Sequence, residues 1–273
     1  MINKYNIITP FGTCRIHRPF EKNINGIIRS TIDHETYINY PQIGFYHSLD
    51  EITQVLTLFK YGAKNAISSY SEYLFRKEPE HTTPNNIFND HLWSENVNEA
   101  LKSIQKIDGT TILIEVSSLD SFYHSQSGLF FQRNPNKELN VPYSDLREKS
   151  FYELFKPELD VIKQKTTKEE IISNLIKIRG MYPLSPIIIL GHINDHFSQY
   201  TSRRELNNIL LDCCSAVAGV YFYDNKAIFE EHGYAINKNG TIDINHLSEK
   251  AEAALGVELQ KISKILKEFI SGT

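Results

Sequence analysis

The stretch that decides the fold class of this chain is Thr110-Thr-Ile-Leu-Ile-Glu-Val116. It is short, rich in β-branched residues and almost continuously apolar, and Asp108-Gly109 marks a turn directly before it. A strand of this kind between two helices is buried on both faces, which is typical of a parallel sheet covered by helices. The stretch therefore predicts an α/β protein.

Strands and helices alternate along the rest of the chain. A short apolar run from Asn6 to Thr9 predicts a first strand, which is expected to break at Pro10 and turn at Gly12. Ser48 and Glu51 form a capping box, which predicts a helix that stops at Gly62. The other expected elements are a weak strand at 34–40, helices at 66–75, 93–104, 168–179, 202–217 and 248–269, and strands at 187–190 and 219–223. This order predicts a three-layer α/β/α sandwich with a mostly parallel five-stranded sheet, in one domain over residues 1–273.

Residues 117–160 separate the central strand from the next clear helix. This segment is too long for a tight connection, so we expect an insertion or lid over the carboxyl edge of the sheet. Open α/β sheets bind ligands at that edge. Polar residues that follow the predicted strands are therefore the candidates for a functional site.

Composition narrows the classes of function and of location. The chain has 273 residues, of which 41% are hydrophobic and 23% charged, so it can bury a full core. A net charge of -4 without a basic tract disfavours a nucleic-acid partner. The sequence has no apolar run long enough for membrane insertion. Three cysteines, two of them adjacent, suit a reducing compartment, and a cytoplasmic location is expected.

Cys14 is the first candidate for chemistry. It follows the first predicted strand and the Gly12 turn, and three basic or potentially basic side chains come directly after it: Arg15, His17 and Arg18. A thiol at such a strand-to-turn elbow would be acidified by helix N–H groups and by the arginines. The structural alternative is a small buried apolar residue. The basic side chains are expected either to hold an anionic group of a substrate or to form a solvated turn.

Asp243 and His246 form the second candidate. A carboxylate three residues before a histidine can orient one imidazole nitrogen while the other acts as a base. The alternative is a helix-capping aspartate beside a surface histidine. We expect Cys14, His246 and Asp243 to meet in space.

Together these motifs resemble the SGNH/GDSL hydrolase superfamily. That family carries its nucleophile in a Gly-Asp-Ser turn after the first strand, where this chain has Gly12-Thr13-Cys14. Its late Asp-x-x-His block, which lies before the last helix, is similar to Asp243-Ile-Asn-His246-Leu-Ser, including the Leu-Ser that opens that helix. The resemblance implies a flavodoxin-like sheet and a catalytic triad. A cysteine in place of the serine resembles the capsule-biosynthesis, acyltransferase-like branch of this fold.

The family also completes an oxyanion hole with a Gly and an Asn from two middle blocks. Gly44 is the candidate for the Gly. For the Asn, chain order points to Ser117, at the end of the central strand, whereas the letters Gly191-x-x-Asn194 fit better but come one strand late. A weakened oxyanion hole would cost a few kcal/mol of transition-state stabilisation.

The resemblance implies an esterase or acyltransferase that forms a covalent acyl-enzyme on Cys14. Its substrate would be a small-molecule ester, an acyl-CoA or an acyl carrier, and no cofactor is expected. The alternative is a catalytically silent relative that binds an anionic ligand near Arg15 and Arg18. A metal site at His192, Asp195 and His196 is a third hypothesis, which the loop composition disfavours. Glu115 is expected to be a buried structural carboxylate or, alternatively, an acid in the site. Cys213 and Cys214 are expected in the core.

Overall fold

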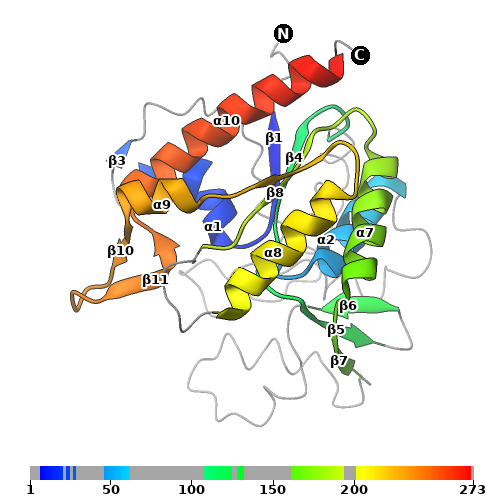
Figure 1. Cartoon of the computed structure of the whole chain (residues 1–273), viewed down its shortest axis with the longest axis horizontal. Helices are drawn as coiled ribbons and strands as arrows, with labels where there is room; N and C mark the ends of the chain where they lie inside the picture. Colours follow the sequence, from blue (N-terminus) through cyan, green and yellow to red (C-terminus); the bar gives the residue numbers. More distant parts are fainter. Residues whose placement is uncertain are drawn as a thin grey trace, which may run out of the picture.

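The computed structural model describes residues 7–20, 23–24, 27–28, 46–61, 107–124, 128–131, 161–193 and 201–271. Its main sheet has four parallel strands in the order β1-β4-β8-β9 (Figure 1). The strands are β1 (Ile8–Phe11), β4 (Thr111–Glu115), β8 (Ile187–Leu190) and β9 (Val220–Tyr223). The α/β class and the parallel sheet predicted from the central strand are confirmed. The weak fifth strand expected at 34–40 lies outside the described residues.

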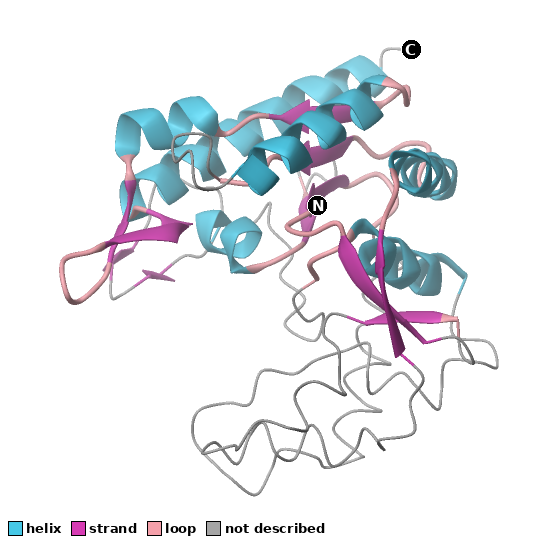
Figure 2. Ribbon diagram, turned by 60° about the horizontal axis from the view of Figure 1, so that its bottom comes forward, coloured by secondary structure: helices cyan, strands magenta, loops and turns pink. Residues whose placement is uncertain are grey.

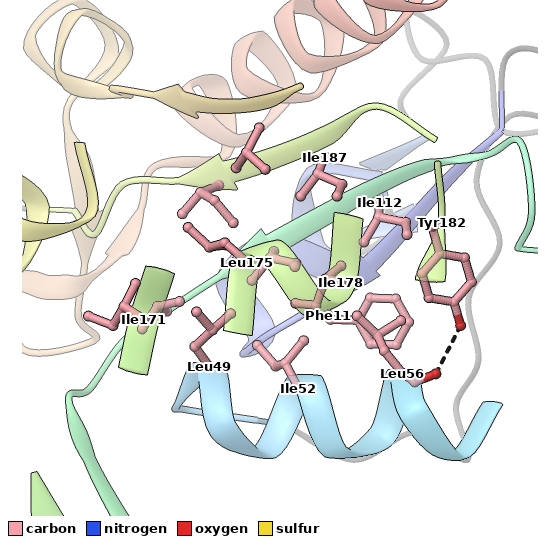
Figure 3. Close-up of a cluster of buried hydrophobic side chains, with 14 of the residues drawn as sticks. Phe11, Leu49, Ile52, Leu56, Ile112, Ile171, Leu175, Ile178, Tyr182 and Ile187 are labelled. Atoms are coloured by element: carbon pink, nitrogen blue, oxygen red, sulfur yellow. Dashed lines mark hydrogen bonds between the residues drawn. The ribbon is translucent and has the colours of Figure 1, made fainter. Parts of the chain in front are cut away.

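Side chains of the central strand alternate between two buried clusters, as the period of a strand requires. Ile112 and Ile114 enter the first cluster with residues of α2 (Leu49–Tyr61), α7 (Lys168–Met181) and α8 (Thr201–Ser215). Figure 3 shows this cluster, in which the Tyr182 hydroxyl donates to the Leu56 carbonyl at 2.9 Å. The first face of the sheet is therefore covered by three helices.

Leu113 enters the second cluster, on the opposite face of the sheet. The elements that complete this cluster are α1 (Cys14–His17), the 3-10 helix η2 (Arg18–Phe20), α9 (Lys226–His232), β11 (Ile242–Leu247) and α10 (Glu249–Ser271). Helices thus cover both faces of the sheet, which gives three layers. Among the described residues, none of the helices combines the length and the apolar character that a membrane span requires.

The first strand differs from its prediction. β1 runs through Pro10, which pairs with Leu113 of β4, so the expected break at this proline is wrong. The backbone carbonyl of Ile7 accepts from Thr111 on the β4 side, and alternate residues point the other way. The missing N–H of Pro10 therefore faces away from β4, where a strand tolerates proline.

Three smaller sheets among the described residues were not predicted (Figure 2). One is antiparallel in the order β6-β5-β7, from β5 (Asp120–His124), β6 (Leu129–Phe131) and β7 (Val161–Lys165). Another is the β10–β11 hairpin, with β10 at Tyr234–Ile236. The third is a short antiparallel pair, β2 (Asn23–Ile24) and β3 (Ile27–Ile28), which follows η2.

The long segment after β4 begins with β5 and β6. Gln54 of α2 attaches it to the body of the domain, because its side-chain amide exchanges two hydrogen bonds with the backbone of Phe130, at 3.1 and 2.9 Å. Residues 132–160 lie outside the described part of the chain, so the lid expected over 117–160 stays a prediction.

Two predicted helix starts are present. Ser48 caps α2: the Glu51 N–H donates to Ser48 Oγ at 3.3 Å, and Glu51 Oε2 accepts from the N–H groups of His47 and Ser48. Ser248 caps α10 by accepting from the Ala251 N–H at 3.1 Å. The capping box of α7, formed by Thr167 and Glu170, was missed.

The capping carboxylate of α2 is unusual because Glu51 is buried and its Oε1 has no hydrogen-bond partner among the described residues. Burial raises the pKa of Glu51 to about 7, against the two backbone hydrogen bonds, which lower it. A carboxyl group whose folded pKa is raised stabilises the fold below its unfolded pKa and loses that contribution as pH rises toward the folded value. The contribution of Glu51 to the free energy of unfolding is therefore expected to fall as the pH rises from about 4.5 to about 7.

Glu51→Gln is expected to remove this loss, because a neutral amide oxygen can accept the same N–H groups without a buried charge. The difference in unfolding free energy between variant and wild type should grow with pH, by up to about 3 kcal/mol. Urea unfolding at pH 5 and pH 8 measures it. The control is Glu170→Gln in the exposed capping box of α7. A difference that is the same at both pH values would show that Glu51 titrates as an ordinary carboxylate.

Candidate functional site

The predicted elbow is present after β1. The strand ends at Phe11, Gly12 and Thr13 turn the chain, and α1 begins at Cys14. The Gly12 carbonyl accepts from the Tyr46 N–H at 3.1 Å. A Cβ added to Gly12 would lie 2.7 Å from the Cβ of Glu115, so only glycine allows β4 to approach the turn this closely. The backbone of Cys14 therefore begins a helix at the carboxyl edge of the sheet, and its side chain lies outside what the structure describes.

Glu115 fixes this elbow from the end of β4. Its buried carboxylate accepts from the Thr13 N–H at 3.0 Å and the Thr13 hydroxyl at 2.5 Å, and it pairs with Arg15 Nε at 2.5 Å. Burial alone would raise the pKa of Glu115. The charge of Arg15, the nearby His192 imidazole and the two Thr13 hydrogen bonds outweigh burial and hold the pKa below its usual value. The contacts support the structural interpretation of Glu115, and they give Thr13 a role in the turn.

Asp243 and His246 form a hydrogen-bonded pair. His246 Nδ1 lies 2.9 Å from Asp243 Oδ2, and Asp243 Oδ1 accepts from the Asn245 N–H at 2.9 Å. Partial burial raises the pKa of Asp243, but the Asn245 and His246 hydrogen bonds and the charge of Arg18 lower it more. A charged carboxylate accepts a hydrogen bond from Nδ1–H, so in the neutral ring the lone pair is on Nε2. The pair is therefore set up as an oriented base.

A bulge in the β10–β11 hairpin presents this pair. Tyr234 pairs with Leu247, but the next residue, Ala235, pairs with Asp243, so the strand register skips residues 244–246. Bulges of this kind redirect side chains. Here the bulge accompanies a contact between the side chains of His246 and Asp243, which lie three residues apart on the same strand. Both residues lie directly before the helix that Ser248 caps, as expected, but the strand β11 that carries them was not predicted.

The Asp243–His246 pair lies near α1, the helix that begins at Cys14. Arg18 begins η2, directly after α1, and its charge contributes to the low pKa of Asp243. The same residue pairs through Nε with Glu252 on α10 at 2.8 Å. Figure 1 shows the hairpin beside α1. Arg18 and Asp243, more than 220 positions apart in the sequence, are thus close enough to interact. The expected meeting of Cys14 with His246 stays a prediction.

The three predicted substrate-binding residues are engaged within the chain. Arg15 pairs with Glu115, and Arg18 pairs with Glu252. Burial lowers the pKa of His17 to about 4, although the charge of Glu115 opposes this shift, so the imidazole is neutral near pH 7. Ion pairs inside the protein therefore account for both arginine charges.

Of the predicted oxyanion residues, only Ser117 is described, and Gly44 and Asn194 lie outside the described residues. The Ser117 N–H donates to the His47 carbonyl at 2.9 Å, and its hydroxyl lies 2.9 Å from His47 Nδ1. The hydroxyl also lies 3.5 Å from the His47 carbonyl, so both the backbone amide and the hydroxyl of Ser117 are engaged by His47. Sequence reasoning missed His47, although its position directly before the helix cap Ser48 at the sheet edge was a signal.

The end of β8 is held by buried amides. Asn207 of α8 accepts from the His192 N–H at 2.7 Å and donates to the His192 carbonyl at 2.9 Å. The His192 ring donates through Nδ1 to the Ile193 carbonyl at 2.7 Å, and burial lowers its pKa to about 3. Within the described residues no group of three or more potential ligands could hold a metal, and Asp195 and His196 lie outside them.

The described residues combine an elbow fixed by a buried carboxylate with a histidine that is hydrogen-bonded to an aspartate. Such a base can accept a proton from a nucleophile at the start of α1 and return it to a leaving group. Cys213 and Cys214 are buried in α8, as expected for core residues. No protein-family model, curated protein or solved structure matches this chain.

Proposed function

We propose that the protein is an acyl hydrolase or acyltransferase of the SGNH type with Cys14 as the nucleophile. The observation that carries the proposal is the His246–Asp243 hydrogen bond on a bulged strand near the helix that begins at Cys14. A nucleophile, a base and a group that orients the base are the three parts of a catalytic triad. The parallel sheet with its elbow after β1 supports the SGNH arrangement.

The proposed reaction has two halves. The Cys14 sulfur attacks the carbonyl carbon of an ester or thioester, and its proton passes to His246 Nε2. The tetrahedral intermediate expels the alcohol or thiol, which takes that proton, and an acyl-enzyme remains. Water, an alcohol or an amine then attacks the acyl carbon and gives its proton to His246, which passes it to the departing Cys14 sulfur. Asp243 stays ionised and holds the imidazole tautomer throughout.

The donor class follows from the nucleophile. A thiolate exchanges readily with thioesters, so an acyl-CoA or acyl-carrier donor fits the site as well as a small-molecule ester does. None of these steps needs a cofactor. The alternative, a silent relative that binds an anion near Arg15 and Arg18, has less support because both charges are paired with buried carboxylates.

Thiol reactivity tests the proposal without knowledge of the substrate. At pH 6.5 an ordinary thiol is about 1% ionised, so rapid reaction of Cys14 with iodoacetamide at this pH would require an acidified thiol. Two internal controls are present, because burial raises the pKa of Cys213 and raises that of Cys214 to about 12. Peptide mass spectrometry should find the label on Cys14 alone.

His246→Ala is expected to move the alkylation profile of Cys14 toward that of an ordinary thiol. In denaturant all three cysteines should react alike, which calibrates the labelling. A folded protein in which Cys14 reacts like a free thiol, with or without His246, would argue against the proposal.

A further inference from the structure

We infer that Arg203 of α8 is a positioning residue for His246. This inference rests on the proposed function, in which His246 is the base. Its guanidinium donates to two groups of the bulge: Nη2 to Asn245 Oδ1 at 2.6 Å and Nη1 to the Ile244 carbonyl at 3.3 Å. Both acceptors belong to the stretch that the β10–β11 register skips. Arg203 therefore supplies hydrogen bonds to the bulge where the strand ladder is interrupted.

The contacts continue from Arg203 to the imidazole. Arg203 holds the side chain of Asn245, the Asn245 N–H donates to one oxygen of Asp243, and the other oxygen of Asp243 contacts His246 Nδ1. Each link joins groups within hydrogen-bond distance. A change at Arg203 is therefore transmitted to the orientation of His246 through two residues, without direct contact with reacting atoms.

The helix that carries Arg203 is itself attached to the sheet edge. Asn207, one turn further along α8, holds both backbone polar groups of His192. The charge of Arg203 also contributes to the low pKa of His192. One face of α8 thus links the end of β8 to the bulge and ties the hairpin to the parallel sheet. The planar guanidinium group of arginine can donate to the Ile244 carbonyl and the Asn245 side chain at the same time, whereas the single ammonium group of lysine cannot reproduce this geometry.

The test compares Arg203→Ala, Arg203→Lys and the matched control Arg204→Ala, whose side chain is exposed on the same helix. The first readout is the tautomer of His246 by nitrogen NMR of the imidazole. In the wild type and the control we expect the proton on Nδ1. In both Arg203 variants we expect a mixture of tautomers, together with Cys14 alkylation slowed by about 10- to 100-fold at pH 6.5.

Asn245→Ala distinguishes positioning from a general effect on stability. If Arg203 acts through Asn245, the double variant should show the same tautomer mixture as either single variant. Lower stability in Arg203→Ala with an unchanged His246 tautomer would overturn the inference. The NMR readout is independent of Cys14, so an unreactive thiol would count against the proposed function while the role of Arg203 is still decided.

Discussion

Asp243→Asn is expected to slow acylation of Cys14 by about 10³- to 10⁴-fold, while the stability of the fold changes little. The carboxylate now accepts from His246 Nδ1 at 2.9 Å. An asparagine that donates there through its amide group would put the histidine proton on Nε2, and a protonated Nε2 cannot accept the proton of the thiol. The measurement is the rate of acyl-adduct formation with an activated ester, followed by intact-protein mass spectrometry.

The matched control is Asp224→Asn. Asp224 follows β9, and its exposed carboxylate accepts from the Lys226 N–H. This variant should acylate at the wild-type rate, because Asp224 contacts no residue of the proposed triad in the described structure. Equal rates in Asp243→Asn and the wild type would show that His246 does not need this carboxylate, and the triad would then be wrong.

Glu115→Ala is expected to destabilise the protein by about 3–5 kcal/mol, because it leaves the partly buried Arg15 without its partner. It also removes the acceptor of the Thr13 N–H and hydroxyl, so the turn before Cys14 loses its fixed conformation. Urea unfolding measures the loss. The rate of Cys14 alkylation at pH 6.5 should also fall in this variant, because the turn before Cys14 is no longer fixed.

The double variant Glu115→Leu, Arg15→Met is the control, because replacing both members of a buried ion pair is often far less costly than removing one. The pKa of Glu115 is lowered in the folded state. Its contribution is therefore complete above the unfolded pKa of about 4 and is lost as pH falls through the folded value. The wild type should lose this stability on acidification and the double variant should not. A single variant as stable as the wild type would contradict the anchoring role.

The features that could be predicted from the sequence depend on local signals. The continuous apolar run of β4 and the capping residues Ser48 and Ser248 act through neighbours in sequence, so the sheet type and two helix starts follow from composition and spacing. Motif order also brought Asp243 and His246 together correctly, because their contact lies within four residues.

The features that were missed depend on partners far apart in the chain. Pro10 stays in a strand because its missing N–H is on the side away from β4, which local propensity does not report. Arg15 was a candidate substrate ligand, but it forms an ion pair with Glu115, which is 100 residues away in the sequence. The bulge in β11 is defined by a register with β10 and by Arg203, and no short pattern encodes either contact.

The central claim is covalent acyl chemistry at Cys14, and intact-protein mass spectrometry tests it most directly. The wild type and Cys14→Ala are each incubated with a small activated ester and, separately, with an acyl-CoA. We predict that the wild type gains the mass of one acyl group and that Cys14→Ala gains none. A wild type that stays unmodified with both donors, or an equal gain in Cys14→Ala, would contradict the account.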